Sequence, residues 1–165
     1  MDLLDTSAVL AHYGNEPGYD VVDRLLNEAK NETGLCVASL LEIDSSLRHK
    51  GIGADERRRM LAIYESAASR VLPVDRRCVS AAIELKASAR PRLPAMDALI
   101  AGCALAHGAT LVHKDPHFDA IPAGRLKTLR LPDSSAATPV DVPRAVKETR
   151  TVYRVGKRKG KRRAS

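Results

Sequence analysis

Short apolar runs alternate along residues 1–131 with longer segments whose apolar positions recur at helical spacing. The runs are typical of strands because they are short and are bounded by polar or turn-forming residues. They predict strands at 1–5, 34–39, 70–75, 110–114 and 126–131. Between the first two, Val22, Leu25, Leu26 and Ala29 form the apolar stripe of an amphipathic helix. Further helices are predicted over 39–50, 55–69, 76–89 and 95–107.

This alternation predicts the fold class. Strands separated by helices pair in parallel through right-handed crossovers, which places helices on both faces of the sheet. We therefore expect a three-layer α/β domain with a parallel sheet flanked by helices. The glycine patterns GxGxxG and GxxxxGK[ST] are both absent from the sequence, so the usual dinucleotide and P-loop sites lose their main support.

Composition narrows the class of protein. The chain has 165 residues, of which 44% are hydrophobic and 28% are charged, as in a single globular domain. Aromatic residues make up 3% and tryptophan is absent, which argues against a base-stacking platform. Cys36, Cys78 and Cys103 have no paired spacing and predict buried thiols in a reducing compartment. No signal peptide or membrane span is recognised, so we expect a soluble cytoplasmic protein with no membrane role.

The net charge of +7 is concentrated at the C-terminal end. Residues 1–132 hold 17 basic and 17 acidic residues, whereas residues 133–165 hold 10 basic and 3 acidic ones. We divide the chain into a domain at 1–132 and a linker with a flexible basic tail at 133–165. The tail either only improves solubility or binds nucleic acid through counterion release. In the second case the expected contacts are Lys157, Arg158, Lys159, Lys161, Arg162 and Arg163.

Four acidic residues fall at or near the ends of predicted strands: Asp5, Glu42, Asp97 and Asp115. In an open parallel sheet the ligand crevice lies at the carboxyl ends of the strands. Carboxylates that converge there repel one another, and a divalent ion relieves that repulsion. Oxygen ligands without a Cys/His cage suit Mg²⁺ or Mn²⁺. The four acids therefore suggest metal-assisted phosphodiester hydrolysis.

Each acid also has a purely structural interpretation. Asp5 suits the N-cap of a helix that begins near Ser7. Ser39 and Glu42 match the S-x-x-E capping box. An acid at Asp97 suits the first turn of a helix, and Asp115 before a proline is a common turn opener.

Asp97 is the acid that a structural role explains least well. It is the only charged residue between Arg92 and His107, on a helix that is apolar on nearly every face. Burial of an unpaired carboxylate is costly, so the sequence predicts a compensating cation beside Asp97.

The segments LLDTSAVLA, ASLLEI and PAMDALIAGCALAHGATLVHKDPHF, with the closing strand, resemble a PIN domain over roughly residues 1–131. The most similar members are VapC-type ribonuclease toxins of toxin–antitoxin pairs. The resemblance implies an Mg²⁺- or Mn²⁺-dependent endoribonuclease, neutralised by a small antitoxin and assembled as a homodimer. It assigns Asp5, Glu42, Asp97 and Asp115 as the catalytic acidic set, in which Asp5, Asp97 and Asp115 bind the metal. Thr6 or Ser7 would support that set or contact a phosphate.

Two positions depart from the family pattern. His113 stands where a small polar residue is common, and His117 stands where a second acid is common in a D-x-D-F pattern. His117 is either a Mn²⁺ ligand or proton donor, or a loop histidine that faces solvent. His12, His49 and His107 show no ligand spacing and receive no chemical role.

Three other functions compete with a toxin nuclease. A phosphatase with an aspartate nucleophile would need an acid where the chain has Ser7. A PIN-like RNA-binding module with weak or no catalysis would rely on the tail. An RNA-processing enzyme would use the same chemistry as the toxin.

Overall fold

The computed structural model describes residues 1–28 and 31–133. The linker beyond 133 and the basic tail, with the six expected nucleic-acid contacts in 157–163, lie outside the described residues. Among the described helices, none is long and apolar enough to cross a membrane.

The described chain follows the alternation expected from the sequence. The strands are β1 Asp2–Leu4, β2 Thr33–Cys36, β3 Arg70–Leu72, β4 Thr110–His113 and β5 Thr128–Arg130. The α-helices are α1 Thr6–Gly14, α2 Tyr19–Asn27, α3 Val37–His49, α4 Ala54–Ala67, α5 Arg76–Ser88 and α6 Ala95–Ala106. A short 3₁₀ helix, η1, spans Pro116–Ala120 between the last two strands.

The strands form one five-stranded sheet in the order β3-β2-β1-β4-β5. Every pair of neighbours is parallel; Leu3, for example, lies opposite Gly34 of β2 and Leu111 of β4. The predicted α/β class with a parallel sheet is therefore confirmed. The chain builds β2 and β3 on one side of β1 and then β4 and β5 on the other, so the strand order reverses between β1 and β4.

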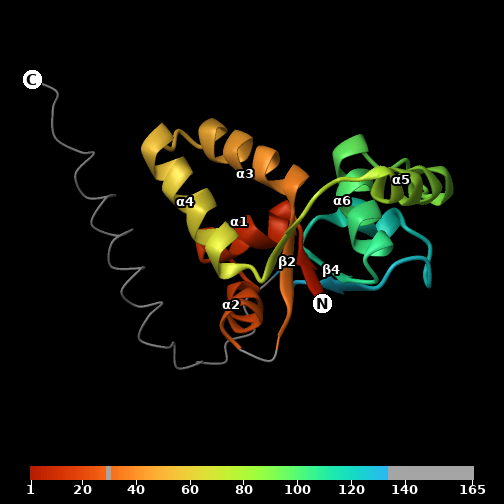
Figure 1. The fold of residues 1–165 in the computed structure, drawn as a ribbon, viewed down its shortest axis with the longest axis horizontal. Coiled ribbons are helices and arrows are strands. Elements are labelled where there is room, and N and C mark those ends of the chain that lie inside the picture. The colour runs from red at the N-terminus through yellow and green to blue at the C-terminus, as the bar shows by residue number, and fades with distance from the viewer. Residues whose placement is uncertain (29–30, 134–165) are drawn as a thin grey trace, which may run out of the picture.

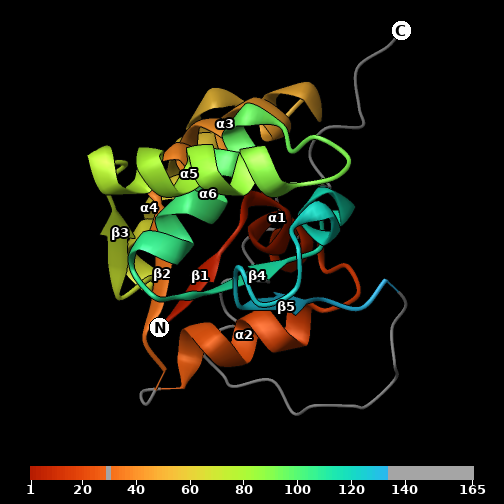
Figure 2. The same cartoon turned by 90° about the vertical axis from the view of Figure 1, so that its right-hand side faces the viewer.

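Neighbouring residues of the central strands face opposite layers of helices, as a side-chain period of two requires. Leu3 and Leu111 join a core under α5 and α6. Leu4 and Val112 join a second core under α1, α2, α3 and α4. Figures 1 and 2 show α5 and α6 on one side of the sheet and α1 to α4 on the other. The three-layer arrangement follows from these two cores.

The second strand is shorter than the sequence suggests. The apolar run 34–39 predicts a strand, but β2 ends at Cys36 and α3 begins at Val37 with no intervening loop. A run that stays apolar from the strand into the first turns of the helix carries no periodic signal for the change from strand to helix. As a result, Glu42 lies in the second turn of α3.

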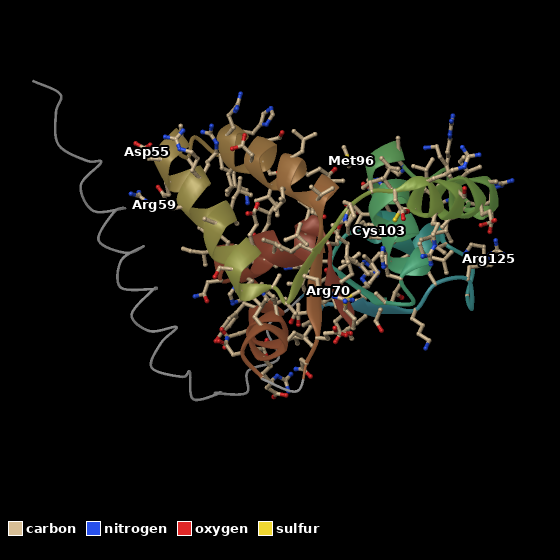
Figure 3. The ribbon with its side chains drawn as sticks, viewed as in Figure 1. Asp55, Arg59, Arg70, Met96, Cys103 and Arg125 are labelled. Atoms are coloured by element: carbon tan, nitrogen blue, oxygen red, sulfur yellow. The ribbon has the colours of Figure 1, made fainter. Side chains whose placement is uncertain are left out.

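All three cysteines are buried free thiols, as expected. They belong to the core between the sheet and the α5–α6 layer, where Figure 3 shows Cys103.

Helices α5 and α6 approach each other closely at Gly102. A Cβ atom at this position would lie 2.5 Å from the carbonyl oxygen of Cys78 and 2.6 Å from the backbone nitrogen of Ala82. Backbone atoms cannot move aside as a flexible side chain can. Gly102 therefore sets the distance between α6 and α5, and with it the position of Asp97 on α6.

We expect Gly102→Ala to lower the free energy of unfolding by about 3 kcal/mol, the upper part of the range for overpacking a core. Urea denaturation measures the change. Gly53→Ala is the matched control, because a Cβ there meets nothing within 4 Å. It should leave stability within about 0.5 kcal/mol of the unchanged protein. Equal stability of the two variants would show that α5 and α6 separate without cost.

Candidate active site

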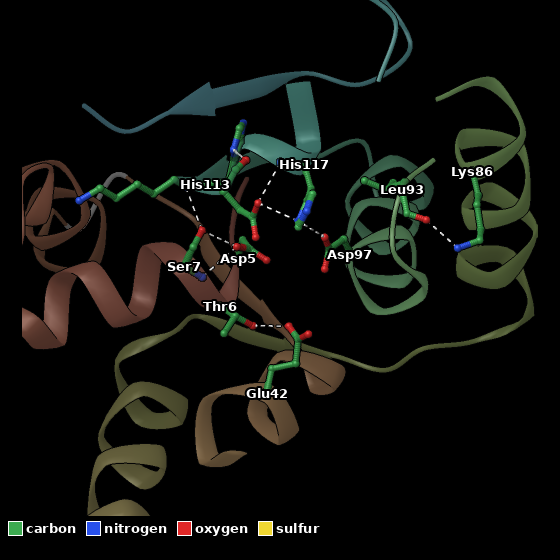
Figure 4. Close-up of polar contacts among 11 residues, drawn as sticks. Asp5, Thr6, Ser7, Glu42, Lys86, Leu93, Asp97, His113 and His117 are labelled. Atoms are coloured by element: carbon green, nitrogen blue, oxygen red, sulfur yellow. Dashed lines mark hydrogen bonds and ion pairs between the residues drawn. The ribbon is translucent and has the colours of Figure 1, made fainter. Parts of the chain in front are cut away.

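A cleft of about 490 Å³ opens at the carboxyl end of the sheet, beside the point where the strand order reverses. A parallel sheet places its ligand crevice at this point, because the adjoining loops diverge there. All four carboxylates singled out from the sequence line the cleft: Asp5, Glu42, Asp97 and Asp115. They come from four different segments of the chain, and Figure 4 shows Asp5, Glu42 and Asp97.

Asp5 is held at the junction of β1 and α1. Its Oδ2 accepts hydrogen bonds from the backbone nitrogen of Ser7, at 2.8 Å, and from the Ser7 hydroxyl, at 2.5 Å. The same hydroxyl accepts a bond of 2.9 Å from the backbone nitrogen of Lys114, just beyond β4. Asp5 is thus the N-cap of α1, as its structural interpretation predicted, and it also faces the cleft.

Burial makes the Asp5 carboxylate costly to ionise. The side chain lies in the protein interior, with the residue only 4% exposed. The pKa of Asp5 is raised from 3.8 to about 6, mainly by loss of solvation and to a smaller extent by the charge of Glu42, although the Ser7 hydrogen bonds favour the ionised form. A nearby cation would offset this cost.

Glu42 reaches the cleft from α3. Its Oε2 accepts a hydrogen bond of 2.8 Å from the Thr6 hydroxyl. Partial burial raises the pKa of Glu42, and the charges of Asp97 and Asp115 raise it as well. The capping-box interpretation is wrong, because α3 begins at Val37 without a side-chain cap and Ser39 lies inside the helix.

Asp97 lies in the first turn of α6, as the sequence indicated. Its side chain is 14% exposed, and its Oδ2 is buried without a hydrogen bond from any described residue. Nδ1 of His117 lies 3.2 Å from this oxygen. Burial raises the pKa of Asp97, and the Asp115 charge adds to the effect while His117 opposes it.

Asp115 follows β4 and caps η1, where its Oδ1 accepts a hydrogen bond of 2.9 Å from the backbone nitrogen of His117. The imidazole of His117 returns to the same oxygen, with Nδ1 at 3.0 Å. His113, the last residue of β4, holds the segment that follows it, because its Nδ1 donates a hydrogen bond of 2.9 Å to the carbonyl oxygen of Asp115. Burial lowers the pKa of His113, which disfavours its charged form.

Two groups of side chains among the described residues bring three possible metal ligands together. Asp97, Asp115 and His117 each place one ligand atom within 4.8 Å of the other two. Cys78, Cys103 and His107 satisfy the same limit, but their thiols are buried in the core and lie outside the cleft lining. The first group, with Asp5 and the orphaned oxygen of Asp97, fits a hard divalent ion.

Sequence reasoning left the role of His117 open. The imidazole lies between two carboxylates rather than facing only solvent, although its side chain is 55% exposed. The position of His117 in DPHF, two residues after a site acid, was the available signal. Cys103 and His107 are also four positions apart, with Cys103 on α6 and His107 at its C-cap, a spacing that places both on one face of the helix end.

The family model of the PIN domain matches residues 3–124. The chain belongs to the PIN domain family. No curated protein matches this chain closely enough to be informative. The PIN domain assignment agrees with the acidic cleft at the carboxyl end of a parallel sheet.

Solved structures of toxin–antitoxin complexes share this PIN fold. VapBC2 from Rickettsia felis, bound to a DNA fragment from its promoter, matches with a TM-score of 0.64 at 21% identity, over 79% of this chain and 98% of that one. VapBC-1 from nontypeable Haemophilus influenzae matches with a TM-score of 0.61 at 16% identity, over 78% and 96%. VapBC-5 from Mycobacterium tuberculosis matches with a TM-score of 0.54 at 24% identity, over 79% and 98%. At these identities the likeness concerns the fold.

Proposed function

We propose that this PIN domain is a metal-dependent endoribonuclease and the toxin of a type II toxin–antitoxin pair. The convergence of four carboxylates in one cleft carries the proposal. Burial raises the pKa of Asp5, Glu42 and Asp97, so the cleft holds acids that are costly to ionise without a cation. Such a set is hard to explain as helix caps alone.

The proposed ligands of the metal, Mg²⁺ or Mn²⁺, are Asp5, Asp97 and Asp115. The orphaned Oδ2 of Asp97 is the observation that fits best, because a bound cation would satisfy it. A divalent ion in this position supplies charge stabilisation to a phosphodiester and lowers the pKa of water. Both hydrogen bonds from Ser7 go to Oδ2 of Asp5, so Ser7 does not compete with a metal for Oδ1.

Glu42 is proposed to orient the attacking water and accept its proton. Its raised pKa brings it nearer to the range in which a general base works well. Thr6 holds one carboxylate oxygen of Glu42 and so directs the other. The water attacks phosphorus in line, the bond to the 3′ oxygen breaks and that oxygen takes up a proton from solvent, so the products carry a 5′-phosphate and a 3′-hydroxyl.

A small antitoxin is proposed as the protein partner, and a homodimer as the assembly. In the VapBC toxin–antitoxin complexes, the chain that matches this one shares its fold. Apolar side chains also remain on the surface beside the cleft. Leu41 of α3 lines the cleft and is 63% exposed, and Val37 on the same helix is 44% exposed.

A PIN-like RNA-binding or RNA-processing module with weak or no catalysis is the second candidate. It is favoured by His117, which replaces an acid that family members commonly carry at this position. Fewer carboxylates would hold a second ion less well.

Cleavage of a mixed RNA pool tests the function. The full chain is incubated with Mg²⁺, Mn²⁺ or EDTA, and the ends of the fragments are mapped. We expect cleavage that needs a divalent ion and leaves 5′-phosphates. RNA binding without cleavage under every metal condition would favour the binding module.

Deletion of residues 144–165 tests the proposed role of the tail. These residues carry ten basic side chains and one acid. If about half of them contact phosphates, the slope of log affinity against log salt should become shallower by about 3 to 4 units. Filter binding to single-stranded RNA between low and high salt measures the slope. An unchanged slope would show that the tail takes no part in binding.

A further inference from the structure

His117 occupies the point at which two site carboxylates meet. Its Nδ1 lies 3.2 Å from Oδ2 of Asp97 and 3.0 Å from Oδ1 of Asp115. Figure 4 shows the imidazole of His117 directed toward Asp97, and Asp5 lines the same cleft as both site carboxylates. A single small ion at this point would have one nitrogen and two carboxylates within reach.

The backbone around His117 is fixed on both sides. Asp115 accepts the backbone N–H of His117. Phe118, the next residue, is 2% exposed and packs edge-to-face on His113, with ring centroids 5.0 Å apart. Because its neighbours are anchored, His117 is presented to the carboxylates by the geometry of η1 while its own side chain stays half-exposed.

We infer that His117 is a metal ligand through Nδ1 and that this nitrogen gives the site a preference for Mn²⁺ over Mg²⁺. The inference rests on the metal-dependent function proposed above. Mg²⁺ demands a near-ideal octahedron of oxygens and gives up water reluctantly. Mn²⁺ belongs to the transition series, whose affinity for nitrogen donors rises from Mn²⁺ onward, so one imidazole costs it less.

A different role for His117 would also explain why its Nδ1 lies beside the carboxylates of Asp97 and Asp115. A protonated His117 can serve as a cation that neutralises Asp97 and Asp115 and gives way when a metal arrives. The two roles predict opposite effects of removing the side chain. Loss of a ligand weakens Mn²⁺ binding, whereas loss of a competing cation strengthens it.

Electron paramagnetic resonance of Mn²⁺ bound to the full chain tests the inference without a nuclease assay. Affinity is read from the signal of free Mn²⁺, and electron spin echo envelope modulation detects ¹⁴N coupled to the ion. We expect ¹⁴N coupling in the unchanged protein and none in His117→Ala or His117→Asp. His117→Ala should bind Mn²⁺ at least about tenfold more weakly.

His117→Asp introduces the carboxylate that the family pattern favours and keeps the number of ligands. We expect it to bind Mn²⁺ without ¹⁴N coupling and to lower the ratio of Mn²⁺ to Mg²⁺ affinity by about tenfold, with Mg²⁺ measured by competition. Both changes lie on an exposed side chain, so thermal unfolding should confirm an intact fold.

Two other histidines are controls for the source of nitrogen. His49 lines the cleft from α3, and His107 belongs to the cysteine-containing group. His49→Ala and His107→Ala should both retain the ¹⁴N coupling.

The possible failures are distinct. Mn²⁺ binding without ¹⁴N coupling in the unchanged protein, coupling that persists in His117→Asp, or tighter Mn²⁺ binding by His117→Ala would each overturn the ligand role and leave the nuclease proposal intact. Loss of coupling in His49→Ala or His107→Ala would also overturn it. Failure of the unchanged protein to bind either Mn²⁺ or Mg²⁺ would overturn the metal-dependent function as well.

Discussion

Asp97→Asn is expected to reduce metal-dependent RNA cleavage by at least about a hundredfold, which corresponds to about 2.7 kcal/mol of transition-state stabilisation. The amide keeps the shape of the side chain but removes the charge that would hold a divalent ion. The buried Oδ2 of Asp97 has no other hydrogen-bond donor among the described residues. Initial rates at saturating Mg²⁺ or Mn²⁺ measure the effect, and circular dichroism confirms the fold.

Asp55→Asn is the matched control for this variant. Asp55 also lies in the first turn of a helix, α4, but its side chain is 82% exposed and pairs with Arg58. Figure 3 shows it on the outer surface of the molecule. The Asp55→Asn variant should cleave RNA at the rate of the unchanged protein. If Asp97→Asn also cleaved within a few-fold of that rate, Asp97 would serve only the helix dipole and the metal proposal would fail.

Asp5→Asn is expected to stabilise the metal-free protein at neutral pH by up to about 3 kcal/mol. The pKa of Asp5 is raised from 3.8 to about 6 in the folded state. Stability from the protonated acid is therefore complete below about pH 4 and is lost as the pH rises through about 6. A shift of about 2 units corresponds to about 3 kcal/mol. Asparagine stays neutral and avoids this loss. The gain in stability is reduced because asparagine accepts weaker hydrogen bonds from Ser7.

Thermal unfolding in EDTA between pH 4 and pH 8 measures this difference. The two proteins should converge near pH 4, and at pH 8 the variant should melt roughly 6 to 12 °C higher. Added Mg²⁺ or Mn²⁺ should raise the melting temperature of the unchanged protein more than that of the variant. A variant that melts lower at every pH would show that Asp5 serves mainly as the cap of α1.

Asp44→Asn is a control in the opposite direction. Hydrogen bonding to Arg57 lowers the pKa of Asp44, and the charges of Arg57 and Arg48 add to the effect. A lowered pKa contributes stability above the unfolded value, which is lost as the pH falls through the folded value. This variant should therefore lose stability at neutral pH, where Asp5→Asn gains it.

Much of the fold follows from local pattern. Strands and helices differ in the period of their apolar positions, so the order of elements and the parallel sheet could be predicted. The boundary at Val37 could not, because the residues on both sides of it are apolar. Likewise, Ser39 and Glu42 satisfied a capping pattern, but α3 had already begun at Val37.

The acids of the cleft were visible in the sequence because each follows a predicted strand or opens a helix. Their convergence was an expectation that depended on strand order. The pairing of β1 with β4 places Asp5 and Asp115 at neighbouring strand ends that face one cleft, and the packing of α6 on α5 at Gly102 positions Asp97 in the same cleft. The first relation joins residues about a hundred positions apart and the second joins residues 20 to 24 apart, so no local pattern encodes either.

Local sequence therefore indicated the order of the strands, most of the helices and the four acids that are candidates for binding a hard cation. Non-local packing decided three features of the cleft. It buries an oxygen of Asp97 without a hydrogen-bond partner among the described residues, raises the pKa of Asp5 and places His117 beside two carboxylates. The physical reason is that propensity and periodicity act over a few residues. Burial, charge interaction and the direction of a side chain depend on whatever the folded chain brings into contact.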